Sequence, residues 1–330
     1  MTRLGGRQLV VILLLTFIAW AGVAFVCLLI GSTGSIGWPT SATLPYRLES
    51  VFLASLVGAA LAVAGVTYQA LLGNPLADPY LLGTSSGAAL AGYLWTLPAF
   101  SGLAGAMAIG QQAMAFLGAI TAVAVVLAIA GGRGRLQPAT LILIGVIVNA
   151  VCGALFLLIN AIVKDIATPG GPMAFLIGGL QTNLQSWQIW TSRIAIFLGF
   201  TVIMLGAGVL NAGTMNDAEA ASLGVPINQL RWGGIIVASL ITAAAVAVSG
   251  PIGFVGLICP HLGRVIVGHD VRRLLPVATM LGAVMLCLAD AASRKISAFG
   301  PVGTYLPVGV ITSLLGGPFF LVLLLTRRKW

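Results

Sequence analysis

The chain has 330 residues, of which 59% are hydrophobic and only 7% are charged. A water-soluble domain carries about 25% charged residues, so this composition excludes a soluble globular protein and indicates an all-α integral membrane protein. Sixteen Lys and Arg against seven Asp and Glu give a net charge of +9. These basic residues are scattered over the ends of apolar segments, which argues against a nucleic-acid-binding surface.

The apolar runs predict the membrane spans. A spanning helix needs about 20 residues, so the chain has room for about ten helices with short connections. In chain order the predicted spans are 8–31, 50–72, 82–98, 106–131, 138–163, 186–210, 228–249, 252–268, 273–296 and 303–326. No connection is long enough for a soluble domain, and we therefore expect a single transmembrane domain over residues 1–330.

The first apolar run resembles a secretory signal only superficially. It is longer than the apolar region of a signal peptide, which has about 7–15 residues, and Trp20 and Phe25 stand where small residues should precede cleavage. We therefore expect residues 8–31 to be a span.

The distribution of basic residues predicts the orientation. With both termini in the cytoplasm, eleven Lys and Arg fall on the inner side, four fall on the outer side, and Arg193 lies within a predicted span. This asymmetry follows the positive-inside rule for an even number of spans. The net positive charge is therefore mainly an orientation signal.

Glycines and prolines interrupt two apolar stretches, 65–83 and 249–273. In lipid, a broken backbone is tolerated only where it is buried in protein or lines a water-filled path, which indicates transport. The two stretches share a spacing of ten and eight residues, between Gly65, Pro75 and Gly83 and between Gly250, Pro260 and Gly268. Paired interruptions of this kind predict two related halves with the transport path at their interface.

The connection 211–226 contains helix-forming residues and ends at Gly224 and Pro226. This pattern predicts a short amphipathic helix at the cytoplasmic surface with a glycine stop. Asp217 and Glu219 place acidic charge there, against the basic trend of the inner side. The residues alone leave open whether the helix is a solvated connector or a docking element for a cytoplasmic partner.

The sequence also bears on the source of energy for transport. The sequence has no Gly-x-x-x-x-Gly-Lys-Ser/Thr loop, so we expect no ATPase site and no enzymatic activity of its own. An ion-driven carrier would keep ionisable groups within its spans. Asp290 is the candidate, but Arg294 follows one turn later and favours a neutralised pair over a proton relay. The driving force therefore comes from a partner, or transport is passive.

Residues that could bind a metal or perform catalysis do not form a known constellation. The four cysteines lie in four different apolar runs without a Cys-x-x-Cys pair, which favours buried apolar roles. His261 and His269 lack metal-site spacing, and we expect His261 to be structural. Gly83–Gly87 matches Gly-x-Ser-x-Gly but lacks the strand–turn–helix setting of a hydrolase. We expect no metal site and no cofactor bound by this chain.

Several motifs occur in order along almost the whole chain. They are Leu56–Gly65, Gln69, Asn74–Pro79, Leu82–Ala88, Gly145 with Asn149, Asp217 to Leu223–Gly224, Gly250–Leu257, Pro260–His261, Arg264, Leu288–Asp290, Arg294, Leu306–Gly309 and Gly317–Phe320. On these motifs the chain resembles the FecCD family, the transmembrane permeases of ATP-binding-cassette (ABC) importers for iron-siderophores, haem and cobalamin.

The resemblance implies a type II ABC importer permease fold in a bacterial cytoplasmic (inner) membrane. It implies a dimer, expected to be a homodimer, with two cytoplasmic ATPase subunits that bind ATP and Mg²⁺ and an extracytoplasmic substrate-binding protein. Transport would proceed by alternating access without chemistry on the cargo. An iron-siderophore is the first expectation for the cargo, and haem and cobalamin remain open.

The resemblance also implies roles for particular residues. Coupling to the ATPase falls on Met215, Asp217, Glu219, Ala220, Leu223 and Gly224. The inner gate falls on Asn74, Leu76, Pro138 and Ala139. The translocation path falls on Asn149, Leu306, Pro307, Gly309 and Thr312. Docking of the binding protein falls on Arg47, Arg294 and Lys295.

The chain departs from the family pattern at three places. Ser50 stands where cobalamin-type members have a second docking arginine, and Glu49 adds an opposing charge. This change should weaken docking only modestly because exposed ion pairs contribute about 0–1 kcal/mol. Tyr305 replaces a glutamate near the outer mouth, and Asn216 stands where a glycine is usual.

Two other classes of protein remain as alternatives. A stand-alone ion-driven secondary transporter would move its cargo without an ATPase. A structural or sensor protein of the membrane would not transport at all.

Overall fold

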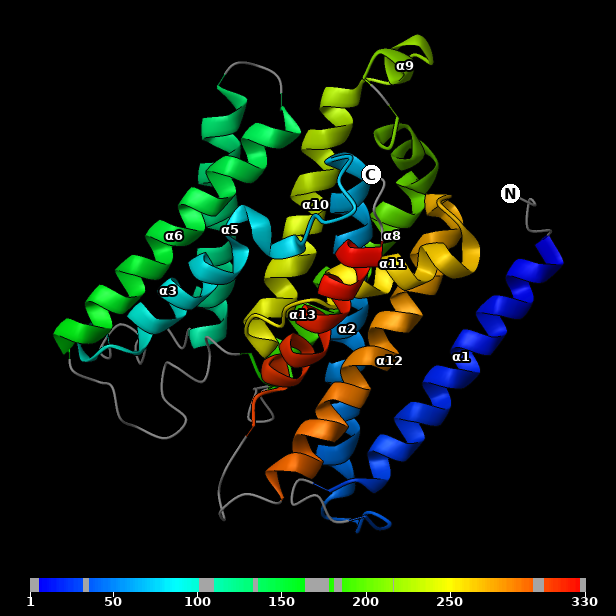
Figure 1. Cartoon of the computed structure of the whole chain (residues 1–330). Coiled ribbons are helices and arrows are strands. Elements are labelled where there is room, and N and C mark those ends of the chain that lie inside the picture. The colour runs from blue at the N-terminus through cyan, green and yellow to red at the C-terminus, as the bar shows by residue number, and fades with distance from the viewer. Residues whose placement is uncertain are drawn as a thin grey trace.

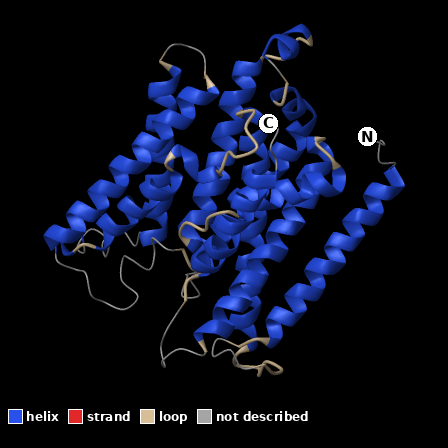
Figure 2. Cartoon of the chain, in the orientation of Figure 1, coloured by secondary structure: helices blue, strands red, loops and turns tan. Residues whose placement is uncertain are grey.

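The computed structural model describes residues 6–31, 36–100, 110–132, 136–163, 178–180, 186–215, 217–298 and 306–326. The regular elements within these ranges are helices (Figure 2), so the predicted all-α class is confirmed.

Each of the ten predicted spans contains a helix. These helices are α1 (Gly6–Leu29), α2 (Leu44–Leu71), α3 (Thr84–Thr96), α5 (Gln111–Gly131), α6 (Pro138–Val163), α8 (Ser186–Gly213), α10 (Ile227–Ser249), α11 (Val255–Val267), α12 (Val271–Ser297) and α13 (Val308–Thr326). Shorter pieces are η1 (Pro79–Leu82), η2 (Pro98–Phe100) and α9 (Asp217–Ser222).

The ten helices are not of equal length. Among the described residues, seven helices are long and apolar enough to cross a membrane, and these are α1, α2, α5, α6, α8, α10 and α12. α3 and α11 have only 13 residues each, and the apolar part of α13 is also short. Because a full span needs about 20 residues, these three helices depend on their neighbours to cover their ends.

α2 forms the centre of the molecule. It is buried along most of its length and packs against α8, α10, α11 and α12, and Figure 1 shows it behind α12 in the middle of the bundle. Gly58 of α2 lies against Gly282 of α12, where a side chain on either residue would collide with the other's backbone. Small residues permit this close approach. In lipid the hydrophobic effect does not hold helices together, so the van der Waals contacts of such close pairs stabilise their packing.

The spacing shared by the two interrupted stretches does not mark equivalent positions, and this prediction was wrong in detail. Gly65 lies within the unbroken helix α2, where its missing side chain admits the backbone of Gly256. Gly250 instead ends α10. Pro75 lies in the loop after α2, whereas Pro260 lies inside α11.

The two halves correspond through their short helices. α3 and α11 have the same length, and each is entered through a residue in the left-handed conformation, Gly83 with φ 86° and Phe254 with φ 69°. In both halves a long, buried helix, α2 or α10, precedes the short one.

The connections gather at two ends of the bundle (Figure 1). We call one the α9 end, which holds the start of α1, residues 213–215 and 217–227, and the α11–α12 turn at 268–270. The opposite end holds the connection from α1 to α2 and the last turn of α12. This alternation agrees with the predicted topology, and the assignment of the α9 end to the cytoplasm stays a prediction.

Candidate functional site

The helix predicted in the 211–226 connection is present as α9 (Asp217–Ser222). Gly224 follows it with φ 75°. Its N–H donates to the carbonyl of Ala221, and the N–H of Val225 donates to that of Ala220. This pair of bonds is the Schellman termination, which requires a residue in the left-handed region and therefore favours glycine. The predicted glycine stop is confirmed.

Apolar side chains on both sides of α9 lie at the surface. Met215 is 43% exposed and Leu223 is 65% exposed, and Glu219 is also exposed. Ala220 is fully buried, so it packs inward and does not face a partner as its assignment to the coupling set implied. One side of so short a helix must rest on the bundle, and the sequence did not show which side.

Asp217 at the start of α9 forms an ion pair with Arg231 in the second turn of α10. Arg231 donates two bonds to the carboxylate, with Nη2–Oδ1 2.7 Å and Nη1–Oδ2 3.0 Å. The Arg231 side chain is 10% exposed and that of Asp217 is 58% exposed. A two-pronged bond of this kind fixes orientation as well as distance.

Arg231 also holds two backbone segments. Its Nε donates to the carbonyl of Leu71, 3.3 Å away, and Nη1 donates to that of Leu136, 3.4 Å away. Leu71 is the last residue of α2, and its carbonyl has no partner within the helix. Asn228 supports the same contact, because its Oδ1 accepts the N–H of Leu136 at 3.1 Å.

The four residues assigned to the inner gate lie just beyond these two carbonyls. Asn74 and Leu76 belong to the loop after α2, where Asn74 Oδ1 accepts the N–H of Leu76 at 2.9 Å and forms a tight turn. Pro138 is the first residue of α6, and Ala139 is exposed. Arg231 therefore connects α9 to the loop after α2 and to the residues just before α6.

Sequence reasoning missed Arg231, which it counted only as an inner positive charge. Its partners lie 14, 95 and 160 residues away along the chain. A lone arginine in an apolar helix was the available signal, because such a residue requires a partner.

The first residue assigned to the translocation path forms hydrogen bonds with other helices of the same chain. Asn149 on α6 donates to the carbonyl of Tyr80 at 2.9 Å and accepts the hydroxyl of Ser86 at 2.6 Å. It thereby joins α6 to η1 and α3.

The structure differs most from expectation at Thr312. This residue is completely buried and donates to the carbonyl of Gly309, 3.1 Å away in its own helix. Thr312 therefore does not line an open path in this conformation. Gly309 is buried as well, whereas Leu306 and Pro307 are half-buried. The exposed face of α13 instead includes Leu314 and Leu315.

The arginines assigned to docking hold the end of α1. Arg47 donates to the carbonyls of Leu28 and Gly37, each at 2.9 Å. Arg294 donates to the carbonyl of Ile30 at 2.9 Å. Cations at a helix C-terminus satisfy carbonyls that have no partner within the helix.

Asp290 and Arg294 form an ion pair with an N–O distance of 2.7 Å, and both side chains are about nine-tenths buried. The predicted neutralised pair is confirmed. The half-buried Lys295 follows at the same helix end. Docking by Arg47, Arg294 and Lys295 stays a prediction.

Other candidate residues have packing roles. Cys27, Cys259 and Cys287 are buried free thiols, and Cys152 is half-buried. The ring of His261 packs edge-on against Phe319 with 6.1 Å between ring centroids. Glu49 is half-buried and Ser50 is buried. Tyr305 and Asn216 lie outside the described residues.

Comparison with known proteins decides the family. The chain matches the FecCD transport family over residues 9–326. It belongs to this family.

The alignments with three relatives extend over most of the chain. The uncharacterized ABC transporter permease YvrB of Bacillus subtilis is 40% identical over 91% of this chain and 84% of its own length. The hemin transport permease HmuU of Yersinia pestis is 39% identical over 87% and 84%. The cobalamin import permease BtuC of Halobacterium salinarum is 38% identical over 86% and 73%.

A solved structure has the same fold. It is described as an inward-facing conformation of a metal-chelate type ABC transporter, and it superimposes with a TM-score of 0.79 at 28% identity, covering 96% of this chain and 99% of the other. This FecCD protein is therefore a multi-pass membrane permease of the metal-chelate class of ABC importers.

Proposed function

We propose that this chain imports a metal chelate by ATP-driven alternating access, as one of two identical permease subunits. Two cytoplasmic ATPase subunits supply the energy and bind ATP and Mg²⁺, and an extracytoplasmic binding protein delivers the cargo. The single observation that carries the proposal is the connection from α9 through Arg231 to the loop after α2 and to α6.

This connection gives a route for mechanical coupling. An ATPase that moves α9 would pull on Asp217, and the two-pronged bond would pass the movement to the Arg231 guanidinium. The guanidinium also binds the carbonyls of Leu71 and Leu136, so the loop with Asn74 and Leu76 and the start of α6 would shift together.

The exposed side chains of α6 are evidence for a second permease subunit. Among the described residues of α6, only Leu141, Gly145, Phe156 and Asn160 are buried, and Leu143, Leu157 and Ile162 are more than half exposed. A helix so weakly packed in its own chain suits contact with lipid or with a partner subunit. We place the path between the two copies, along Asn149, Leu306, Pro307 and Gly309.

The proposed cargo rests on the cargoes for which the relatives are named. HmuU is named for hemin and the archaeal BtuC for cobalamin, and a related FecC of Escherichia coli is named for Fe(3+) dicitrate. These cargoes are all metal chelates. We propose an iron-siderophore as the first candidate, with haem and cobalamin next.

The structure gives less support to a stand-alone ion-driven transporter. Its candidate proton relay was Asp290, but the Arg294 guanidinium lies 2.7 Å from this carboxylate and both are buried. Neutralising such a pair by protonation would leave the arginine uncompensated, which is costly in lipid.

Asp217→Arg tests the proposal. The substitution places two cations face to face, so α9 should detach from Arg231. In proteoliposomes that contain the permease with its ATPase, we expect stimulation of ATP hydrolysis by the loaded binding protein to be lost while the protein remains inserted.

The double variant Asp217→Arg/Arg231→Asp restores a pair of opposite charges between α9 and α10, but an aspartate cannot donate to the carbonyls of Leu71 and Leu136, so the stimulation should remain lost. Stimulation that equals that of the wild type in Asp217→Arg alone would contradict the proposed coupling.

A further inference from the structure

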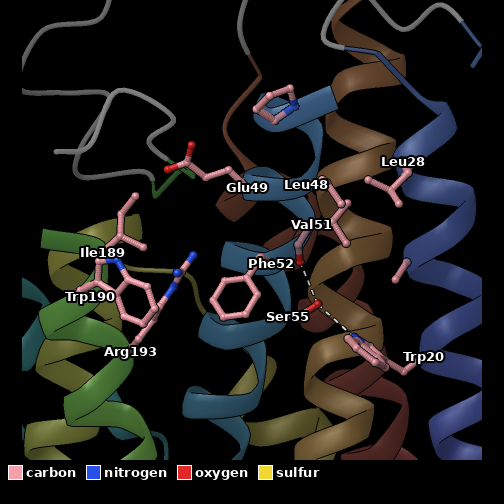
Figure 3. A pocket seen from close by; sticks show the side chains of 12 residues that line it. Trp20, Leu28, Leu48, Glu49, Val51, Phe52, Ser55, Ile189, Trp190 and Arg193 are labelled. Atoms are coloured by element: carbon pink, nitrogen blue, oxygen red, sulfur yellow. Dashed lines mark hydrogen bonds between the residues drawn. The ribbon is translucent and has the colours of Figure 1, made fainter. Parts of the chain in front are cut away.

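A pocket of about 570 Å³ opens between α1, α2 and α8 at the end of the bundle opposite α9 (Figure 3). Its wall is apolar and includes Trp20, Leu28, Phe52 and Trp190. Phe52 is 44% exposed and Trp190 is 59% exposed. The pocket therefore opens toward the surroundings of the bundle, which for this membrane protein are lipid.

Arg193 projects into this apolar pocket. Its guanidinium carbon lies 4.0 Å from the Phe52 ring centroid and 4.9 Å from that of Trp190. Figure 3 shows the guanidinium between the two rings. Its Nε is buried and donates no hydrogen bond. Stacking fixes the plane of the guanidinium but satisfies none of its N–H groups.

The pocket lies at headgroup depth. α8 begins at Ser186, so Arg193 stands about 10 Å along the helix from its start, at 1.5 Å per residue. Tryptophans mark the interface between lipid and water, and Trp190 flanks the guanidinium. An arginine without an acidic side chain beside it attracts an anion at this depth, and phosphate matches its forked donors.

Glu49 adds the opposite charge. It lines the same pocket, and Figure 3 shows its carboxylate displaced from Arg193 toward the end of the helices. Within the described part of the chain the two residues form no ion pair with each other or with another side chain. A ligand that meets both charges carries a phosphate at the deeper position and a cation nearer to the surface.

We propose that this pocket binds a zwitterionic phospholipid with a primary ammonium, such as phosphatidylethanolamine. Its phosphate accepts N–H bonds from Arg193, its ammonium donates to Glu49, and the first part of an acyl chain covers Trp20 and Phe52. A phosphatidylcholine has no N–H to donate to Glu49, and a phosphatidylglycerol has no cation. The volume suits a small ligand, whereas a protein helix is about 10 Å wide and needs a longer groove.

Native mass spectrometry of the full-length chain tests the proposal. Phosphatidylethanolamine, phosphatidylcholine and phosphatidylglycerol with the same acyl chains are added to the protein in detergent. We expect one tightly held phosphatidylethanolamine, bound about tenfold more tightly than phosphatidylcholine, which corresponds to about 1.4 kcal/mol.

Variants separate the two charges. Arg193→Gln should weaken binding of both zwitterionic lipids, whereas Glu49→Gln should bring phosphatidylethanolamine to the level of phosphatidylcholine. Arg7→Gln alters an exposed arginine at the start of α1 and should retain the preference of the wild type. Ala24→Phe fills the pocket, keeps both charges and should also release the lipid, which provides a second test if Arg193→Gln does not fold.

Equal affinity of the wild type for the two zwitterionic lipids would overturn the proposal. Retention of phosphatidylethanolamine by both Arg193→Gln and Ala24→Phe would overturn it as well. Crosslinking from position 190 to a second copy in the membrane would assign the pocket to a protein contact instead.

Discussion

At the scale of single residues, Arg231 forms hydrogen bonds with three residues and not only with Asp217. It meets both oxygens of Asp217 and the carbonyls of Leu71 and Leu136 while remaining buried. Lysine has the same charge but lacks the planar fork, so it cannot make these bonds at once.

Replacement of Arg231 should separate coupling from folding. Arg231→Lys keeps the charge and should retain the fold while reducing the cargo transported per ATP hydrolysed. Arg231→Gln should reduce this ratio further and also lower stability, because each buried unpaired carbonyl costs about 1–3 kcal/mol. Transport and hydrolysis measured on the same proteoliposomes give the ratio. Arg7→Gln, which alters an exposed arginine at the start of α1, is the control. A ratio unchanged in both Arg231 variants would show that the contact is only structural.

Asp270 joins α8 to α12 at the α9 end. Its Oδ1 accepts from the Asn211 amide at 2.9 Å and from the Arg272 N–H at 3.0 Å. Burial alone would raise the pKa of Asp270, but these bonds and the charges of Arg273 and Arg272 hold its pKa below the ordinary value. The charged form is therefore favoured in the folded chain.

The lowered pKa of Asp270 predicts a pH dependence. Because the folded pKa lies below the unfolded value of about 3.9, the stabilisation is present above that pH and is lost as the pH falls through the folded pKa. Asp270→Asn should melt at a lower temperature than the wild type near neutral pH, and the difference should shrink below about pH 4. Thermal unfolding of the purified chain over this range measures it. A difference independent of pH would contradict the assignment.

The sequence predicted some residue roles and not others. Gly224 was predictable, because a left-handed helix stop within a short connection favours glycine. Thr312 was not, because α13 is apolar on all sides and such a helix gives no indication of which face is packed. The contacts of Arg231 were not predictable either, since they join residues far apart in the chain.

At the scale of elements, α11 depends on its close contact with α2. Gly65 of α2 lies against the backbone of Gly256, and a methyl group at position 65 would collide with that backbone. Apolar runs predicted α3 and α11 as short segments, 82–98 and 252–268, but placed their starts two or three residues too early and their ends one or two too late.

Gly65→Ala should destabilise the protein through this contact. We expect a loss of about 1–3 kcal/mol, typical of an overpacked interior, measured by thermal unfolding in detergent. Gly22→Ala is the matched control, because Gly22 lies in α1 with open space around it. If the two variants melt alike, the close contact of α2 with α11 does not contribute to stability.

At the scale of the whole molecule, the two ends of the described bundle differ in the residues that they carry. The α9 end carries exposed Met215 and Leu223 and the Arg231 connection. The opposite end carries Arg47 and Arg294, which hold α1 in place. This polarity fits a permease placed between an ATPase and a binding protein.

Uptake of a radiolabelled ferric siderophore into proteoliposomes tests the central claim most directly. The chain is reconstituted alone or with its ATPase, and the loaded binding protein is supplied at the face opposite the ATPase. We predict uptake only with both partners and ATP, and none with the chain alone under a proton or sodium gradient. Gradient-driven uptake by the chain alone that ATP does not change would contradict the account.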